Sequence, residues 1–436
     1  MAGVLLTFIP WLPLNRKSTE GNAIASQHPD SERKKSFPLG TDENGISKVY
    51  MVRNGTPDQN VHKIIEMMGG IEKYIGPNDI VVLKPNAQWW NQGMTNTDAM
   101  QGFIDIVLNI PGFSGEVIIA ENHQYEEDDS RGWTTEYRNG KYNLNELVEH
   151  YQRSGYPNVT KYHWRVAGTA KIILEGDAQG NSRVTGPQDG DGYVWMEDNY
   201  YLSPAGKKCV MTYPVFTSTY SGITIDLKNG AWINGKYLED KKIKFINFSA
   251  LNHHGWYCGV TASVKNLMGV VDMTCGFPGD SPQDTYNTHH IGISKLILLT
   301  RKRMIWRIGK MDWFFPHCYR NFHHTGGVLG HFMKHVRLPE INIITAEQVG
   351  WGSRTDVAKS FRSKAILAAT DPVALDYIAA REVLLPATPA SEDNFRKLND
   401  PDIYDRPFHK FIAETEKQGI GTLNPANIQQ INYSFP

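Results

Sequence analysis

The stretch KFINFSALNHHGWYCGVTASVKNLMG, residues 244–269, joins an apolar run to a dense group of reactive side chains. Its first part, residues 244–251, predicts a buried strand. Its second part, residues 252–269, contains two histidines, a thiol, hydroxyls, a lysine and an amide. Polar residues at the carboxyl end of a strand, with glycines that let the chain turn, are typical of the sites of α/β proteins. We therefore expect a functional site in this segment.

A similar arrangement occurs earlier in the chain. The apolar run at residues 80–83 leads directly into Lys84, and Asn86 follows closely. With Lys265 and Asn266, this gives two Lys/Asn pairs, each just after a predicted strand. Ammonium and amide groups suit an oxygen-rich or anionic ligand. The alternative interpretation is a solvated lysine at a turn that the intervening proline imposes.

The order of the predicted elements indicates an α/β fold. Apolar runs of strand length alternate with segments of helical periodicity. Strands are expected at residues 80–83, 116–122, 158–164, 244–251, 341–344 and 365–369. Helices are expected at residues 61–75, 99–108, 143–154, 290–299, 371–384 and 407–417. This alternation predicts a mainly parallel sheet flanked by helices.

The expected organisation has four parts. Residues 1–42 form a signal-like segment and a polar linker, and residues 43–170 form an N-terminal α/β half. Residues 171–242 are rich in Gly, Asp and Tyr and predict a β-rich insertion. Residues 243–436 form a C-terminal α/β half, in which residues 301–335 make an aromatic and histidine-rich lobe.

The N-terminal segment has some features of an export signal. The apolar run at residues 4–14 is too short to span a bilayer, and Ala23-Ile-Ala25 suits signal-peptidase cleavage. The basic region that normally precedes such a run is missing, so either the true start lies upstream or this is not a signal peptide. We expect an exported or periplasmic protein, with a cytoplasmic one as the alternative. No later segment has the length and composition of an integral membrane span.

Charge and motif content exclude several classes of protein. The net charge of −1 gives no basic field for nucleic acid. The chain has no G-x-S-x-G, no Walker A loop, no G-x-G-x-x-G and no H-E-x-x-H. These absences argue against common α/β hydrolases, P-loop enzymes, dinucleotide dehydrogenases and zincins. A small-molecule ligand is the expected partner.

The strongest candidate metal ligands by residue type are His253, His254, Cys258, His289 and His290. Imidazole and thiolate suit a divalent metal, which separate loops would have to assemble here. The four cysteines include no C-x-x-C pair, which argues against an iron–sulfur cluster. Histidines that pair with backbone carbonyls and carboxylates are the alternative. Further donors follow in or near the lobe: His317, Cys318, His323, His324, His331 and His335.

Two carboxylates complete the candidate site. Glu121 ends the strand at residues 116–122, where it could work in acid/base chemistry or bind a ligand. A solvated acidic loop is the alternative for that region. Asp371 is expected to cap the helix at residues 371–384, and Asp376 is expected to face the site.

Three blocks of the sequence resemble the domain of unknown function 362 family. The first is Val82–Asn86, followed by Thr95–Asp98. The second is Ser263–Gly269, with histidine pairs on both sides, and the third is Ala368–Asp376. The blocks appear in the family's order, and the resemblance implies an α/β fold without a settled activity. Some relatives carry ferredoxin-type cysteine motifs, which this chain lacks.

Three hypotheses about function remain open at this point. The first is a protein that binds or transforms a small anionic metabolite in a Lys/Asn/His-lined cleft. Its expected catalytic residues are Lys84, Lys265, His254 and Asp376, and its expected substrate-binding residues are Asn86, Asn266 and Glu121. The second is an exported metal- or redox-centre-binding protein without catalysis of its own, and the third is a non-catalytic interaction domain.

Overall fold

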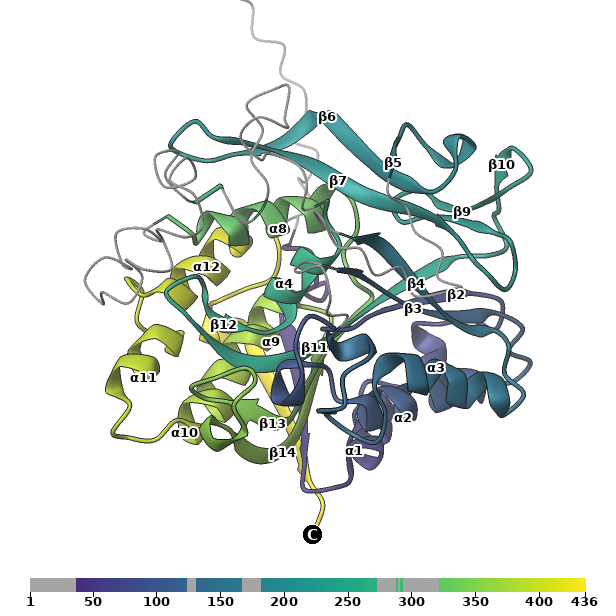
Figure 1. Cartoon of the computed structure of the whole chain (residues 1–436). Helices are drawn as coiled ribbons and strands as arrows, with labels where there is room; N and C mark the ends of the chain where they lie inside the picture. The colour runs from purple at the N-terminus through teal and green to yellow at the C-terminus, as the bar shows by residue number, and fades with distance from the viewer. Residues whose placement is uncertain (1–36, 124–130, 167–181, 273–287, 289–290, 293–320) are drawn as a thin grey trace, which may run out of the picture. The chain divides into compact units, whose positions relative to one another are not determined.

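The computed structural model describes residues 37–123, 131–166, 182–272, 288, 291–292 and 321–436 (Figure 1). The chain divides into two units, Met1–Ser36 and Phe37–Pro436, and every described residue belongs to the second. The signal-like segment, all but residues 291–292 of the helix expected at residues 290–299, and the residues His289, His290, His317 and Cys318 lie outside the described residues.

A nine-stranded mixed sheet forms the centre of the second unit. Its strands are β1 (Ser47–Arg53), β2 (Ile80–Lys84), β3 (Glu116–His123), β4 (Val159–Val166), β11 (Ile243–Gly255), β12 (Gly259–Thr261), β13 (Ile341–Gly350), β14 (Phe361–Ala369) and β15 (Ile428–Ser434). Eight of them follow the order β15-β1-β14-β13-β11-β2-β3-β4, and β12 pairs with β11. Within this order β14 alone runs against its neighbours. The expected α/β fold with a mainly parallel sheet is confirmed.

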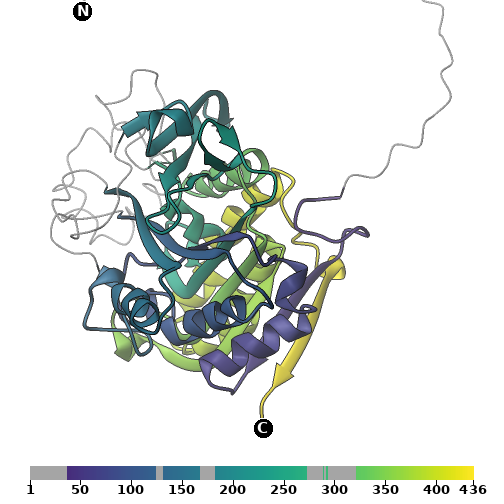
Figure 2. The ribbon, with the colours of Figure 1, turned by 90° about the vertical axis from the view of Figure 1, so that its right-hand side faces the viewer.

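Helices cover both faces of the sheet because successive residues of its buried strands face opposite sides. In β2, Val81 and Leu83 join one hydrophobic cluster while Ile80 and Val82 join the other. The first face packs against α1 (Pro57–Met67), α2 (Thr97–Leu108) and α3 (Leu144–Arg153) (Figure 2). The opposite face packs against α4 (Ser263–Asn266), α8 (His324–His335), α9 (Pro372–Ala379) and α12 (Pro407–Glu416). The short helices α10 (Leu385–Ala387) and α11 (Asp393–Asn399) connect α9 to α12.

A second sheet lies in the segment expected to be β-rich. It has the order β10-β9-β8-β7-β6-β5 and is separate from the central sheet (Figure 1). Its strands are β5 (Ser182–Val184), β6 (Gly192–Leu202), β7 (Lys208–Thr217), β8 (Thr224–Asp226), β9 (Gly230–Ile233) and β10 (Lys236–Tyr237). The ring of Phe216 on β7 lies 4.7 Å from that of Tyr162 on β4. The second sheet therefore shares a core with the central one.

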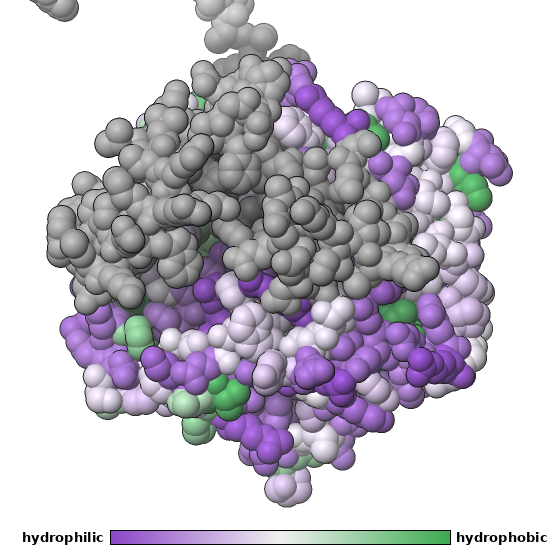
Figure 3. Space-filling model, in the orientation of Figure 1, coloured by the Kyte–Doolittle hydropathy of each residue, from purple (hydrophilic) through white to green (hydrophobic). Residues whose placement is uncertain are grey.

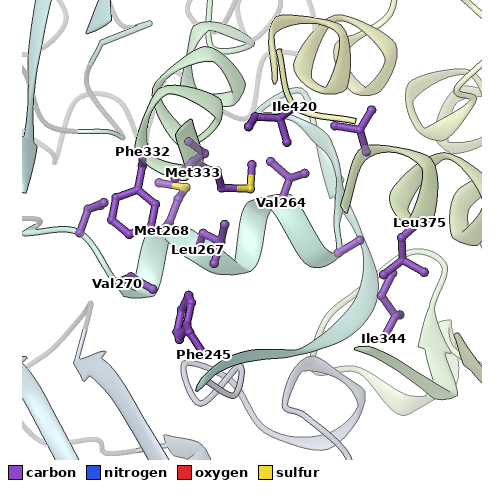
Figure 4. Packing of buried hydrophobic residues seen from close by; sticks show 14 of the residues in the cluster. Phe245, Val264, Leu267, Met268, Val270, Phe332, Met333, Ile344, Leu375 and Ile420 are labelled. Carbon is purple, nitrogen blue, oxygen red and sulfur yellow. The ribbon is translucent and has the colours of Figure 1, made fainter. Parts of the chain in front are cut away.

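The short helix α4 is held by apolar contacts on several sides. Val264 of α4 and the following Leu267 and Met268 are buried, as are Phe332 and Met333 of α8 (Figure 4). This packing fixes the helix that carries Lys265 and Asn266.

Some local expectations are corrected by the structure. The cap of α2 is Asn96, whose Oδ1 accepts the N–H of Ala99 at 2.9 Å, so the helix begins two residues before the expected residue 99. Leu39, which was assigned to the linker, forms a β-bridge with Ile420 and so belongs to the fold. The strands β1 and β15 were not predicted, and β13 continues six residues beyond the expected end at residue 344.

The described helices lack the features of a helix that crosses a membrane. None of these helices combines the length and apolar composition that crossing a bilayer requires. On the coloured part of the face drawn in Figure 3, hydrophilic residues predominate and hydrophobic ones are scattered.

Phe248 of β11 provides a test of the core. It is fully buried, and its ring lies 5.6 Å from that of Phe103 on α2. We expect Phe248→Ala to lower the free energy of unfolding by about 3–5 kcal/mol, because the cavity removes these contacts. Urea denaturation measures the change. Phe361→Ala is the control, since Phe361 is 53% exposed and its truncation should change stability by less than about 1 kcal/mol. Equal losses in the two variants would contradict the described core.

Candidate functional site

Four parallel strands bring the candidate residues to one edge of the sheet. β13, β11, β2 and β3 are successive neighbours that run in the same direction, so their carboxyl ends lie together. Lys84 is the last residue of β2, and Glu121 lies near the end of β3. α4, with Lys265 and Asn266, follows β11 and β12. The carboxyl edge is where α/β sheets usually bind ligands.

Lys84 and Glu121 form a buried ion pair. The Lys84 Nζ donates to Glu121 Oε1 at 2.8 Å, to Asn266 Oδ1 at 3.0 Å and to the Pro85 carbonyl at 2.7 Å. The other carboxylate oxygen of Glu121 accepts the N–H of Ala87. Burial lowers the pKa of Lys84 and raises that of Glu121, and each charge opposes the shift of the other. All three ammonium donors of Lys84 are therefore used inside the protein.

A chain of amides extends from this ion pair across the sheet. The Asn266 Nδ2 donates to Asn247 Oδ1 at 2.8 Å, and the Asn247 Nδ2 donates to Asn342 Oδ1 at 2.9 Å. The hydroxyl of Ser263 donates to the same Asn342 oxygen at 2.9 Å. The chain joins β2, α4, β11 and β13. Because its members satisfy one another, it holds α4 at the strand ends.

Asp376 caps α4 from the opposite side. Its two carboxylate oxygens accept the backbone N–H groups of Ser263 at 2.7 Å and Val264 at 3.0 Å. Burial raises the pKa of Asp376 to about 8. Asp371 caps α9, as expected, by accepting from the N–H groups of Val373 and Ala374. Both carboxylates thus stabilise helix starts.

Gly269 makes room for the buried ion pair. A Cβ atom at this position would lie 2.3 Å from Glu121 Oε1 and 2.5 Å from Lys84 Nζ. A side chain would therefore collide with both charged groups. Steric exclusion of a side chain therefore explains why residue 269 is a glycine.

Lys265 differs from Lys84 because no described residue pairs with its ammonium group. Lys265 is only 7% exposed, yet within the described part of the chain it makes no hydrogen bond or ion pair. Burial lowers the pKa of Lys265 to about 8, and the positive charges of Arg354 and Lys84 act in the same direction. The side-chain amide of Asn86 also lacks a hydrogen bond among the described residues, while its backbone N–H is bound by Thr95 Oγ1 at 2.7 Å.

Arg354 adds a second positive charge beside Lys265. It lies in the loop after β13, and its guanidinium carbon lies 4.2 Å from the centre of the Trp89 ring. One guanidinium nitrogen lies 3.3 Å and 3.4 Å from the two ring nitrogens of His254. Arg131 also contacts Trp89, at 4.5 Å from the ring centre. The guanidinium of Arg354 is therefore stabilised by contacts with an indole ring and an imidazole ring, and among the described residues no carboxylate pairs with it.

The three described members of the predicted metal set serve other interactions. His253 Nδ1 lies 2.8 Å from Asn399 Oδ1, and burial lowers the pKa of His253 to about 4. His254 Nδ1 lies 2.6 Å from Thr261 Oγ1. Burial raises the pKa of the Cys258 thiol to about 12, and the thiol donates to the Val260 carbonyl at 3.2 Å. In the described ranges these three do not form a metal-ligand group.

The structure brings together most of the residues that the sequence singled out. Lys84, Glu121 and Asn266 meet directly, and Asp376 reaches them through α4. Sequence reasoning missed Arg354, Trp89 and the inner amides of Asn247 and Asn342. The amides were hidden inside apolar runs. Arg354 was hidden because β13 was expected to end at residue 344, whereas it ends at Gly350.

The fold and the site define a mixed α/β protein with a polar, partly cationic centre at the carboxyl edge of its sheet. Residues 226–381 match the model of the domain of unknown function family DUF362. This match confirms the family resemblance and assigns that segment to DUF362. It includes the blocks that hold Lys265 and Asp376, whereas the block at Val82–Asn86 lies outside it. No curated protein and no solved structure matched the chain.

The buried ion pair gives a test of the site's architecture. We expect Glu121→Gln to lower the free energy of unfolding by about 3–5 kcal/mol, because it leaves the Lys84 charge buried without its partner. Urea denaturation measures the loss. The matched control is Glu66→Gln, which breaks the pair between Lys63 and Glu66, whose Glu66 side chain is 69% exposed; it should cost less than about 1 kcal/mol. Similar losses in the two variants would show that the inner pair is not a structural constraint.

Proposed function

We propose that the protein binds a small anionic metabolite, one that carries a carboxylate or phosphate group, beside Lys265, Arg354 and His254. The observation that carries this proposal is positive charge without a counterion among the described residues. In the described ranges neither Lys265 nor Arg354 forms an ion pair with a carboxylate. A buried charge without a partner costs free energy, so a ligand anion that supplied the missing charge would be stabilised there.

The nearby groups suit recognition of an anion. A guanidinium can bind a carboxylate or phosphate through two parallel hydrogen bonds, and its stacking on Trp89 limits the orientations of Arg354. The Lys265 ammonium adds a compact charge, and the amide of Asn86 adds an uncharged donor and acceptor. Two cations and an amide at one edge of the sheet can therefore neutralise the charge of an anionic ligand and orient its hydrogen bonds.

The same residues divide into positioning and reactive groups. Lys84, Glu121, Asn266 and Asp376 use their polar atoms inside the protein, so their proposed role is to hold α4 in place. Lys265 has a pKa of about 8 because of its burial, which places its proton exchange near neutral pH. Lys265 is therefore the candidate for proton transfer to or from a bound ligand. This geometry does not favour catalytic roles for Lys84 and Asp376, because their polar atoms are already bound within the protein.

The alternative of an exported metal- or redox-centre-binding protein has less support at this edge. His253, His254 and Cys258 are occupied by protein groups, and burial keeps the thiol of Cys258 protonated at neutral pH. Thiolate is the form that binds metals, so Cys258 is a poor ligand here. Export remains a prediction from the N-terminal segment.

The proposal predicts that Lys265→Met and Arg354→Met each weaken anion binding. Calorimetric titration of the full chain with inorganic phosphate, pyrophosphate and citrate would measure the binding affinity. Titration with chloride at matched ionic strength would serve as the reference. We expect a loss of at least about tenfold in affinity, because a charge-assisted hydrogen bond contributes about 1.5–3 kcal/mol. The control is Lys236→Met, since Lys236 is exposed on β10 and should not change binding. No binding of these anions by the native chain, or equal binding by all variants, would contradict the proposal.

Anion affinity should also depend on pH through Lys265. Its pKa of about 8 means that the ammonium is charged below this pH and loses its charge above it. Binding of citrate should therefore weaken between pH 7 and pH 9, although citrate itself gains slightly in negative charge over this range. Lys265→Arg keeps a positive charge throughout this range, so its affinity should vary less with pH. Titration of both proteins at the two pH values tests this, and parallel pH profiles would exclude Lys265 as the titrating group.

A further inference from the structure

A second cluster of chemically reactive side chains lies between α8 and α12. His323, His324 and Glu414 each offer one ligand atom, and these three atoms lie within 4.8 Å of one another. Among the described residues, no other group of three His, Cys, Asp or Glu side chains has this spacing. His324 and Glu414 are buried, whereas His323 is half-buried and connects the cluster to solvent.

Glycines on α8 bring the members of this cluster close together. A Cβ at Gly326 would lie 2.0 Å from the Phe411 carbonyl of α12, and one at Gly330 would lie 2.9 Å from the Thr415 carbonyl. These two glycines are four residues apart and therefore share a helix face. A Cβ at Gly327 would lie 2.5 Å from the ring of Tyr201. Bare backbone on α8 thus lets Glu414 and Tyr201 approach the histidines.

Polar atoms of Glu414, His324 and Tyr201 lie close to one another in this cluster. Glu414 Oε2 lies 3.6 Å from His324 Nδ1, and the Tyr201 hydroxyl lies 3.2 Å from each of these atoms. Lys417 binds the other carboxylate oxygen, Oε1, at 2.6 Å. Lys417 therefore pairs with Oε1 of Glu414, whereas Oε2 is the carboxylate oxygen near His324.

We propose that His323, His324 and Glu414 bind one zinc ion. Two imidazoles and a carboxylate are ligands that Zn²⁺ accepts, at metal distances of about 2.0–2.2 Å. Nitrogen and oxygen atoms spread over less than 5 Å need shift only slightly to reach such distances around one ion. Three protein ligands leave the fourth position of a tetrahedral ion open for water, next to the Tyr201 hydroxyl. This site is separate from Lys265 and does not depend on the proposed anion binding.

A purely structural ion pair is the competing explanation. His324, when protonated, would pair with Glu414 through the contact at 3.6 Å, and Tyr201 would bridge them. That explanation requires only His324 and Glu414. Binding of zinc with a contribution from all three side chains distinguishes the proposed metal site from a simple pair.

The experiment uses the full chain without a histidine tag, stripped of metal by a chelator and titrated calorimetrically with zinc. We expect one ion per chain, and we expect Glu414→Gln and His323→Gln each to weaken zinc affinity at least tenfold. His331→Gln is the control, because His331 also lies on α8 beside a second histidine, His335, at a ring distance of 4.2 Å. It should bind zinc as the native chain does. Circular dichroism would confirm that each variant is folded.

Cobalt provides a second measurement that does not depend on the variants. Co²⁺ in the native chain should give the visible absorption of a tetrahedral site without a thiolate-to-metal band, because no cysteine belongs to the cluster. Absence of zinc binding by the native chain would overturn the proposal. A strong thiolate band would place the metal at a cysteine site, and loss of binding in His331→Gln would place it at the other histidine pair; either result overturns the proposal too.

Discussion

The arrangement of this protein's polar centre depends on the burial of one ion pair, Lys84 with Glu121. Two charges removed from water are tolerated only when their hydrogen-bonding capacity is satisfied. Here the third ammonium donor reaches Asn266, which ties the end of β2 to α4. The same constraint explains Gly269, because any side chain there would occupy the volume of the charged groups. Lys265 is next to Asn266 in α4, so the pair also determines where the unpaired lysine lies.

The contrast between the two buried lysines separates structure from chemistry. Lys84 has a carboxylate and two oxygen acceptors, whereas the described groups that act on the charge of Lys265 are the cations Arg354 and Lys84, the thiol of Cys258 and the carboxylate of Glu121. Burial of an ammonium group without a partner lowers stability, so packing alone does not account for Lys265. The proposed anion would supply the missing charge. Under that proposal, Lys265 is the residue on which ligand binding at this edge depends most directly.

The sequence predicted the order of strands and helices well where apolar periodicity was strong, as at β2, β3 and α2. It failed at β15, since an edge strand buries little and its pattern is weak, and at β1, where the buried residues include the polar Ser47. In the site, Lys84 and Asn266 were found because they end predicted strands or follow them. Arg354 was missed because only tertiary structure shows that β13 ends beside Trp89. Glu414 was missed because its meeting with His324 depends on glycine packing between two distant helices.

The pairing of β1 has a consequence for how the chain is made. β1 pairs with β14 on one side and with β15 on the other, so that Tyr50 lies opposite both Ala368 and Ile431. During synthesis, this early strand leaves the ribosome long before either partner exists. Its backbone groups must meanwhile be solvated or shielded, because unpaired strand edges favour aggregation. The outer edge of the central sheet can therefore form only after the residues of β15 have been synthesised.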